Sequence, residues 1–471
     1  MTASASTAYD SGRYCIIGAG PGGISVARAF GRAGIPYDLV ERHSDVGGIW
    51  DIDNPGSPVY ESAHFISSSG ISHFAGVPMP EDYPDYPSHE RILAYLRGVA
   101  AREGLYSHLR ASTEVVRAER IDEGWRVVLR GCHGTETTDY AGIVCASGTT
   151  WHPKMPSWPG VFAGEVVHSS RYRSAAELAG RRVLVVGAGN SGCDIASDAA
   201  TAAKAAFISM RRGYHFIPKH VFGMPTDVFA DKSKYMPMAL RRWVFERILC
   251  ILNGDLTKLG LPAPDHPLLA SHPITNDQLL HYLRHGDVSV KPDVKRLDGL
   301  ELEFVDGTRE RIDLVICATG YETRTPYLPE GTLPTRGGRP DLYLNIFSRS
   351  HRDLFCTGFL ESNSGLFKLF DLMAHTIAQA VLARRDPAAN TKFRRRVEQH
   401  APDLSGGIRY VESDRHANYV NIDAYRAALT DLCKRMEWPS FDPDGLALLP
   451  PAVEVQEARD WKRTSASVRG L

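Results

Sequence analysis

The sequence predicts an α/β fold built from two units of one type, the second inserted into the first. Two stretches carry this prediction, because in each an apolar strand leads through a glycine-rich turn into a helix of small residues: "YCIIGAGPGGISVARAF" at 14–30 and "LVVGAGNSGCDIA" at 184–196. A third observation is that "CASG" at 145–148 is echoed by "CATGY" at 317–321, on the far side of the second unit. Such units are typical of Rossmann-like dinucleotide-binding domains.

The first unit reads as strand, glycine turn, helix and strand over 13–42, the length expected of a βαβ motif. A helix is expected over 88–110, where Ser88 precedes an acidic first turn. A buried strand follows at 141–148. The proline-rich stretch 149–160 then reads as a connector between domains.

The second unit runs over 181–212 and is followed by a long region rich in proline, histidine and aromatic residues. A hairpin is expected within 300–321, with Asp306-Gly307 at its turn. Beyond residue 385 the pattern is polar and helical. The apolar residues of 238–252 recur at helical spacing, and this helix is expected to pack on the core or to form a lid: Leu240, Val244, Ile248 and Ile251.

Composition excludes several function classes. The 471 residues carry a formal net charge of −1, which argues against a large basic surface for nucleic acid or anionic membrane. The eight cysteines form no CxxC pair, so neither a metal site, nor a redox dithiol, nor a disulfide framework is predicted. No apolar stretch is long enough for a membrane span and the first ten residues do not read as a secretory signal, so a cytoplasmic protein is expected.

The first glycine turn has the spacing GxGxxG between a strand and a helix. Its glycines permit a tight turn, close approach of a pyrophosphate and close helix–strand packing, and the phosphate meets the helix N-terminus. Glu41 ends the next strand, where an acid can hold both hydroxyls of a ribose. This first cradle is therefore predicted to bind FAD through Gly18, Gly20, Pro21, Gly22, Gly23 and Glu41.

The second glycine turn has the same spacing, but the strand after it ends without an acid. An acid there would repel a 2′-phosphate, whereas a guanidinium can bind it in a bidentate manner. A solvated strand end is the alternative explanation of the arginines. This second cradle is predicted to bind NADPH through Gly187, Gly189, Asn190, Ser191, Gly192, Ser209, Arg211 and Arg212.

Two nucleotides in one chain indicate hydride transfer from a nicotinamide to a flavin. The flavin electrons could then pass to a dithiol, to another protein or quinone, or to dioxygen. The missing CxxC removes the first of these.

Between the cradles, "FAGEVVHSSRYR" at 162–173 fits the pattern FxGxxxHxxx(Y/F)(K/R), carried by Phe162, Gly164, His168, Tyr172 and Arg173. This motif resembles the signature of the flavin-containing monooxygenases, in the branch that oxygenates nitrogen and sulfur. "GGIW" at 47–50 is similar to the family's GGxW, which implies that Gly48, Ile49 and Trp50 also bind FAD. The resemblance implies a structural or gating role for His168, with general-base catalysis as the alternative.

One position departs from the family pattern. Where the family has an asparagine near flavin and nicotinamide, ungapped counting places Ile66, which cannot donate a hydrogen bond. Ser67 or Ser68 is the alternative donor. The stretch 213–229 either lines the active site or packs as an ordinary long loop.

The resemblance implies a mechanism in which NADPH reduces FAD, dioxygen adds at flavin C4a, and the hydroperoxide transfers one oxygen to an amine or sulfide. Two alternatives stay open: Baeyer–Villiger oxygenation of a ketone, and an uncoupled NADPH oxidase or flavin reductase. The partners implied are a small-molecule substrate and dioxygen, with a homodimer as the expected assembly.

The predicted domains are the first part of an FAD domain, an inserted NADPH domain, the second part of the FAD domain with C-terminal helices, and a tail compatible with disorder: 1–152, 153–316, 317–450 and 451–471.

Overall fold

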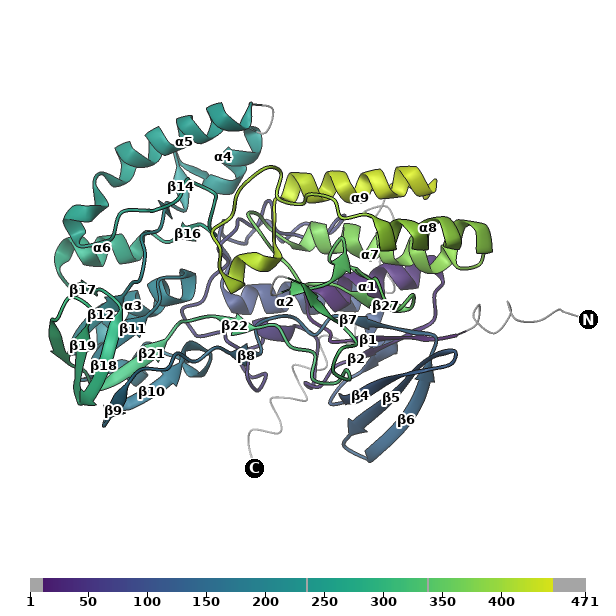
Figure 1. The fold of residues 1–471 in the computed structure, drawn as a ribbon, viewed down its shortest axis with the longest axis horizontal. Coiled ribbons are helices and arrows are strands. Elements are labelled where there is room, and N and C mark those ends of the chain that lie inside the picture. Colours follow the sequence, from purple (N-terminus) through teal and green to yellow (C-terminus); the bar gives the residue numbers. More distant parts are fainter. Residues whose placement is uncertain (1–11, 234–235, 337–338, 444–471) are drawn as a thin grey trace, which may run out of the picture.

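The computed structural model describes residues 12–233, 236–336 and 339–443. The fold is mixed α/β, with two mainly parallel sheets in separate halves of the molecule (Figure 1). The tail predicted at 451–471 lies outside the described residues.

The first sheet has the order β25-β26-β27-β7-β1-β2-β3, and its five strands from β27 to β3 run parallel. The strands are β1 (Tyr14–Ile17), β2 (Tyr37–Val40), β3 (Leu109–Arg110), β7 (Gly142–Cys145), β25 (Leu342–Tyr343), β26 (Phe347–Ser348) and β27 (Leu354–Cys356). Every residue of β1, β2 and β7 is buried, which explains their short, almost entirely apolar runs.

Helices cover one face of this sheet and a small antiparallel sheet covers the other (Figure 1). The helices α1 (Pro21–Ala33) and α7 (Phe367–Ala383) pack together through the buried pair Arg28–Asp371, with nitrogen–oxygen distances of 2.8 and 2.9 Å. The antiparallel sheet consists of β4 (Glu114–Ile121), β5 (Gly124–Gly131) and β6 (Gly134–Tyr140).

The second sheet has the order β10-β21-β11-β12-β17 and is parallel throughout. Its strands are β10 (Glu165–His168), β11 (Arg182–Val186), β12 (Ala205–Ser209), β17 (Val288–Lys291) and β21 (Leu314–Cys317). The helices α3 (Asn190–Ala202) and α6 (Gln278–His285) lie on one face. The other face carries β9 (Gly160–Phe162), β18 (Val294–Gly299), β19 (Glu301–Phe304) and β20 (Arg309–Arg311). The hairpin turn predicted at Asp306-Gly307 is confirmed between β19 and β20.

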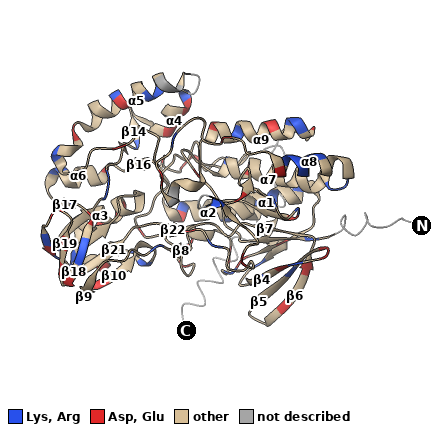
Figure 2. Ribbon diagram, viewed as in Figure 1, with Lys and Arg blue, Asp and Glu red and all other residues tan. Residues whose placement is uncertain are grey.

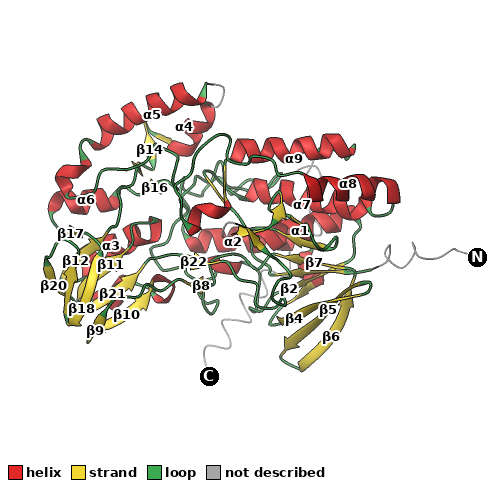
Figure 3. Ribbon diagram, in the orientation of Figure 1, coloured by secondary structure: helices red, strands yellow, loops and turns green. Residues whose placement is uncertain are grey.

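All strands of the second sheet fall between β7 and β27 in the chain. The chain enters and leaves this part along neighbouring paths, because β8 (His152–Pro153) pairs with β22 (Tyr321–Glu322). Figure 3 shows that this connection between the two halves consists mainly of loops.

The helix predicted over 88–110 is shorter in the structure. Helix α2 (His89–Arg102) ends before Gly104, whose φ of 68° is left-handed, and a 3₁₀ turn at Leu105–His108 leads into β3. The polar region beyond residue 385 is largely helical, as predicted, with α8 (Pro387–Gln399) and α9 (Ile422–Met436).

The apolar stripe predicted on the helix at 238–252 is only partly correct. Helix α5 (Met238–Asn253) packs through Phe245 and the buried Leu249, while Leu240 is 47% exposed and Ile251 is 82% exposed. The packing face is rotated away from the predicted stripe because it is set by Ile217 and Leu268. Lysine, arginine and acidic residues are interspersed along α5 and α9 (Figure 2). Within the described part of the chain, no helix is long and apolar enough to cross a bilayer.

Candidate functional site

The first cradle is a tight turn that only glycines allow. Gly18 has φ of 106°, and a Cβ there would lie 2.7 Å from the Ala146 carbonyl oxygen. A Cβ on Gly23 would lie 1.8 Å from the Gly18 oxygen. Helix α1 starts at Pro21 with no side-chain cap and no acid in its first turn, so its N-terminal N–H groups are available to an anion.

A second glycine segment faces this helix start. Gly48 has φ of 60°, and a Cβ there would lie 2.9 Å from Gly20 Cα. The backbone N–H of Gly47 donates to the Ala19 oxygen at 3.1 Å. Asn54 Nδ2 donates to the Gly48 oxygen at 3.0 Å. The segment Gly48–Trp50 is thus held directly against the first cradle.

Two polar side chains at the first cradle suit a dinucleotide. Glu41 is buried, and its Oε2 accepts the Ala19 N–H at 2.7 Å while Oε1 accepts the His43 N–H at 2.9 Å. Thr357 is completely buried beside Gly22, and its hydroxyl has no hydrogen-bond partner in the structure. An unpaired buried hydroxyl at a helix N-terminus fits the phosphate oxygens of FAD.

The second cradle repeats the geometry of the first. Gly187 has φ of 103°, and a Cβ on Gly192 would lie 2.0 Å from the Gly187 oxygen. Helix α3 begins at Asn190, again with no side-chain cap and no acid in its first turn. Asn190 Oδ1 accepts the Thr275 N–H at 2.8 Å, which anchors a distant loop beside the cradle.

The last residue of β12 and the two arginines that follow the strand differ in their exposure. Ser209 is buried, and its hydroxyl donates to the Pro292 oxygen at 2.7 Å, so it points away from solvent. Its backbone oxygen accepts the Gly187 N–H at 3.0 Å. Arg211 is exposed and Arg212 is half-buried. These arginines are the cations that follow the strand next to the second cradle.

His168 links the end of β10 to the loop after β21. Its Nδ1 accepts the Ser170 N–H at 3.1 Å, so the proton lies on Nε2, 3.0 Å from the Gly320 oxygen. The ring packs edge-on against Tyr321. Burial lowers the pKa of His168, which favours the neutral form.

The rest of the motif at 162–173 joins the two halves of the molecule. Gly164 has no side chain, and this leaves room for the ring of Phe162. A Cβ at position 164 would lie only 2.6 Å from that ring. The Tyr172 hydroxyl donates to Asp198 Oδ2 on α3 at 2.8 Å. Arg173 donates to the oxygens of Ser170 and Tyr172, both at 2.9 Å, and reaches the Val59 oxygen at 3.3 Å.

Two further side chains from the Gly48 side reach the same helix. Ser62 Oγ donates to Asp198 Oδ2 at 2.6 Å, and the Tyr60 hydroxyl donates to Asp194 Oδ2 at 2.8 Å. Asn276 Nδ2 binds the other oxygen of Asp194 at 2.6 Å. Burial raises the pKa of both Tyr60 and Asp194. These hydrogen bonds connect the region between the first glycine turn and residue 66 to α3, the helix of the second cradle.

The stretch predicted to lie near flavin packs beside Gly48–Trp50, because Trp50 stacks on Phe65 at 4.8 Å. Ile66 is 37% exposed. The Ser67 hydroxyl accepts from the Ser72 hydroxyl at 2.6 Å. Ser68 N–H donates to Asp227 Oδ2 at 2.6 Å, while its buried hydroxyl has no partner.

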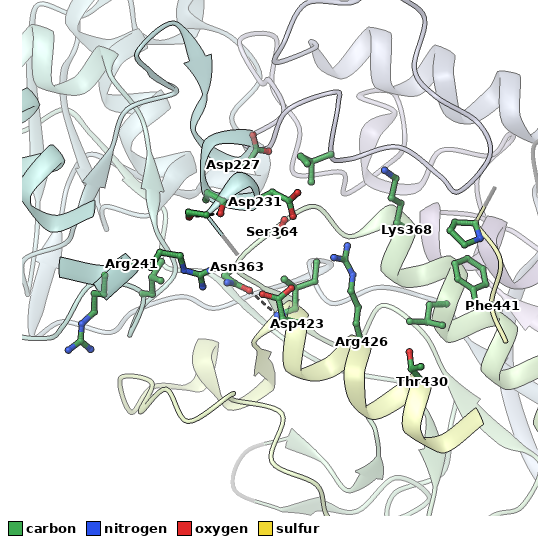
Figure 4. Close-up of a pocket in the computed structure, with 18 of the residues that line it drawn as sticks. Asp227, Asp231, Arg241, Asn363, Ser364, Lys368, Asp423, Arg426, Thr430 and Phe441 are labelled. Atoms are coloured by element: carbon green, nitrogen blue, oxygen red, sulfur yellow. Dashed lines mark hydrogen bonds between the residues drawn. The ribbon is translucent and has the colours of Figure 1, made fainter. Parts of the chain in front are cut away.

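A cavity of 890 Å³ lies beyond this stretch (Figure 4). Its walls come from Ile71, from α4 (Thr226–Lys232) and α5, and from α7 with the segment before it together with α9. Asp227 connects the cavity to the Ser68 backbone. The stretch 213–229 therefore contributes to this cavity through its C-terminal end. In the described ranges no cluster of three metal-ligating side chains occurs.

Several candidate residues are not evident from sequence. Thr357 is one of them, because it follows β27 and is far from the first cradle in sequence although it lies beside it in the fold. Asp194 and Asp198 lie one turn apart on α3. This spacing predicts that they share one face of the helix, but it does not predict their hydrogen-bond partners. The cavity has no sequence signal either, since its walls come from segments far apart in the chain.

Comparisons with known proteins point to one family. The model of a family described as flavin-binding monooxygenase-like (FMO-like) matches residues 11–423. Flavin-containing monooxygenase 5 of Rattus norvegicus is 28% identical over 427 residues, which cover 86% of this chain and 79% of that protein. Probable indole-3-pyruvate monooxygenase YUCCA9 of Arabidopsis thaliana is 28% identical over 379 residues, covering 75% and 87%. The crystal structure of OTEMO in complex with FAD and NADP has a similar fold, with a TM-score of 0.64 and 19% identity, covering 90% of this chain and 97% of that one.

Proposed function

This chain belongs to the flavin-binding monooxygenase-like family, and from that membership we propose that it is an NADPH- and dioxygen-dependent flavoprotein that oxygenates the nitrogen or sulfur of a small molecule. The balanced reaction consumes substrate, O₂, NADPH and H⁺, and forms the oxygenated substrate, NADP⁺ and water. The observation that carries the proposal is the pair of glycine cradles that end differently, one in Glu41 and one in arginines.

The first cradle is the proposed FAD site. The N–H groups at the start of α1 and the unpaired hydroxyl of Thr357 would bind the pyrophosphate. Each oxygen of Glu41 accepts one backbone N–H and retains a lone pair for the ribose hydroxyls. Gly48, Ile49 and Trp50 would border the ring system.

The second cradle is the proposed NADPH site. Asn190 and Ser191 open the helix that would bind the pyrophosphate, and Arg211 and Arg212 would bind the 2′-phosphate. Ser209 is proposed to support the site without contacting the nucleotide through its hydroxyl, because that hydroxyl already donates to the Pro292 oxygen. When bound, the nicotinamide supplies hydride and the flavin supplies activation of dioxygen.

The domain assignment follows from these sites. We take 1–152 and 317–450 as the FAD domain and 153–316 as the inserted NADPH domain. In this proposal the protein positions the two domains and excludes water from the site. No side chain is assigned a proton-transfer role. His168 is assigned a structural or gating role, because its Nε2 proton is already donated to Gly320. Assembly as a homodimer stays a prediction.

The test uses purified protein with bound FAD. Anaerobic mixing with NADPH should bleach the flavin absorbance, and NADH should do so more slowly. In air, an amine or sulfide should yield its oxide with consumption of one NADPH. Arg212→Ala should raise the KM for NADPH and leave that for NADH unchanged. Failure of NADPH to reduce the flavin would contradict the proposal.

A second candidate is oxygen insertion beside a carbonyl. It is favoured by the relative whose name specifies indole-3-pyruvate, a 2-oxo acid. Product analysis with one ketone and one sulfide separates the two functions, because only insertion converts a ketone to an ester.

A further inference from the structure

Five cationic side chains line the cavity of 890 Å³, and two of them, Lys368 and Arg426, face it from the neighbouring helices α7 and α9. Lys368 comes from the first turn of α7 and Arg426 from the second turn of α9, and both side chains extend toward the interior of the cavity (Figure 4). Arg426 is half-buried and makes no hydrogen bond or ion pair with any residue that the structure describes. Two like charges that face one space are stabilised when an anion lies between them.

In the part of the chain that the structure describes, none of the three acids that line the cavity forms an ion pair with Arg426: Asp227, Asp231 and Asp423. Asp423 lies one turn before it on α9, yet the described side chains form no ion pair between the two. Asp227 stands on the α4 side, and its oxygens already accept the N–H groups of Ser68 and Val228 at 2.6 and 2.8 Å. The positive field at the start of α7 also reaches His73, whose pKa is lowered first by burial and further by Lys368.

The remaining walls suit an organic body of moderate size. Leu268 and Ile422 are buried, and Phe245, Leu372 and Trp438 add apolar surface. A cavity with apolar walls and a few fixed charges is the usual form of a small-molecule site. Its edge at Ile71 adjoins the Ser67–Ser72 turn, so one end of a bound molecule would lie near the proposed flavin site.

We propose that this cavity binds organic carboxylates, with the carboxylate held by Arg426 and Lys368 and the apolar body directed toward the Ser67–Ser72 turn. Arginine suits this role because its planar guanidinium can hold both oxygens of a carboxylate. This proposal rests on the proposed function for the chemistry at the other end of the molecule, which is oxygenation of a sulfur or nitrogen atom. The binding of the carboxylate itself does not depend on that chemistry.

The test compares two sulfides of nearly equal size, 3-(benzylsulfanyl)propanoate and its primary amide. Each would be converted by one O₂ and one NADPH, with H⁺, to its sulfoxide, NADP⁺ and water. We expect the holoenzyme to favour the acid in kcat/KM. In Arg426→Met the preference should fall by about 10- to 100-fold, through a higher KM for the acid, because one charge-assisted contact is lost. Arg426→Lys should retain part of the preference.

Arg242→Met is the matched control. Arg242 lines the same cavity but pairs with Glu246 on its own helix at 3.8 Å, so its loss should leave the preference unchanged. An equal rate for acid and amide in the wild type, or an equal effect of Arg426→Met on both, would overturn the proposal.

Failure of the proposed function gives a different result, since neither sulfide would then be oxidised. Calorimetric titration of the holoenzyme with each compound decides the binding proposal in that case. Binding of the acid that Arg426→Met weakens at least tenfold would support the carboxylate site. Absent binding, or equal binding of acid and amide, would refute it.

Discussion

At the scale of single residues, Ile66 is the most informative side chain near the proposed flavin site. It is 37% exposed and lies next to Phe65, which stacks on Trp50. Its neighbours offer few donors: the Ser67 and Ser72 hydroxyls are bonded to each other, and Ser68 has a buried hydroxyl without a partner. On the proposed function, we therefore expect the coupling of NADPH use to product formation to depend on whether a donor is present at this position.

We predict that Ile66→Asn lowers the hydrogen peroxide released per NADPH consumed. A side-chain amide would add one hydrogen bond, which corresponds to about a 2- to 10-fold change in the ratio of product to peroxide. The measurement is peroxide against NADPH in air, with and without a sulfide. Ile66→Val, which adds no donor, is the control and should behave as the wild type. An unchanged ratio in the asparagine variant would show that the side chain at position 66 does not control coupling.

His168 gives a prediction for pH. Burial lowers its pKa in the folded state, so the unfolded chain binds more protons as the pH falls below the ordinary histidine range. Stability contributed by neutral His168 is complete above that range and is lost on acidification, by at most about 1.4 kcal/mol per pH unit for one proton. From pH 7.5 to 5.5 we expect Tm to fall more steeply in the wild type than in His168→Gln. His133→Gln, in an exposed turn, should keep the wild-type slope.

At the scale of elements, α3 serves both halves of the molecule. Its first turn opens the second cradle, and its next two turns carry Asp194 and Asp198, which accept from Tyr60, Ser62 and Tyr172. Helix α3 therefore contacts both the second cradle and the stretch leading to Ile66. These contacts support the hypothesis that nucleotide binding at one cradle changes the geometry of the other.

We predict that Tyr60→Phe slows reduction of the flavin by NADPH while the content of bound FAD stays the same. Among the described residues, the change leaves Asp194 with Asn276 as its remaining side-chain donor. Loss of a buried hydrogen bond to a carboxylate destabilises by about 1.5–3 kcal/mol. Reduction rates from anaerobic mixing, together with Tm, provide the measurement. The matched control is Tyr83→Phe, whose hydroxyl donates to the Arg91 oxygen at the surface. Equal rates in the wild type and Tyr60→Phe would contradict the coupling.

What sequence can predict differs between these elements. The glycine turns were predictable because their geometry is local: spacing alone requires close approach of helix and strand. The packing face of α5 was not, since it depends on Ile217 and Leu268, which no periodicity within the helix encodes. Thr357 and the Tyr60–Asp194 bond were missed for the same reason, as their partners are more than 100 residues apart in the chain.

At the scale of the whole molecule, the two sheets repeat one design within a single chain. Each has a buried parallel core, a glycine turn at the end of its central strand and a helix that starts without a cap. The second sheet is inserted between β7 and β27 of the first, and β8 and β22 form the paired connection. From this organisation we expect that one proposed nucleotide site can be altered while the other half of the molecule remains folded.

The last prediction tests that independence with two equivalent changes. In Gly23→Ala the new methyl group would lie 1.8 Å from the Gly18 oxygen, and in Gly192→Ala it would lie 2.0 Å from the Gly187 oxygen. Since backbone must move in both, we expect Gly23→Ala to lose bound flavin. Gly192→Ala should keep its flavin but lose reduction by NADPH by about 100-fold or more, the scale of a lost phosphate site of about 3 kcal/mol.

Gly98→Ala controls for the substitution itself, because no atom lies within 4 Å of a Cβ at that position of α2 and alanine favours a helix interior. Flavin absorbance after gel filtration reports the first cradle, and anaerobic bleaching by NADPH reports the second. Dithionite, which needs no nucleotide site, should still bleach Gly192→Ala and so show that its flavin remains reducible. Loss of flavin from Gly192→Ala would mean that the two halves fold as one cooperative unit, and normal reduction by NADPH would place the nicotinamide nucleotide elsewhere.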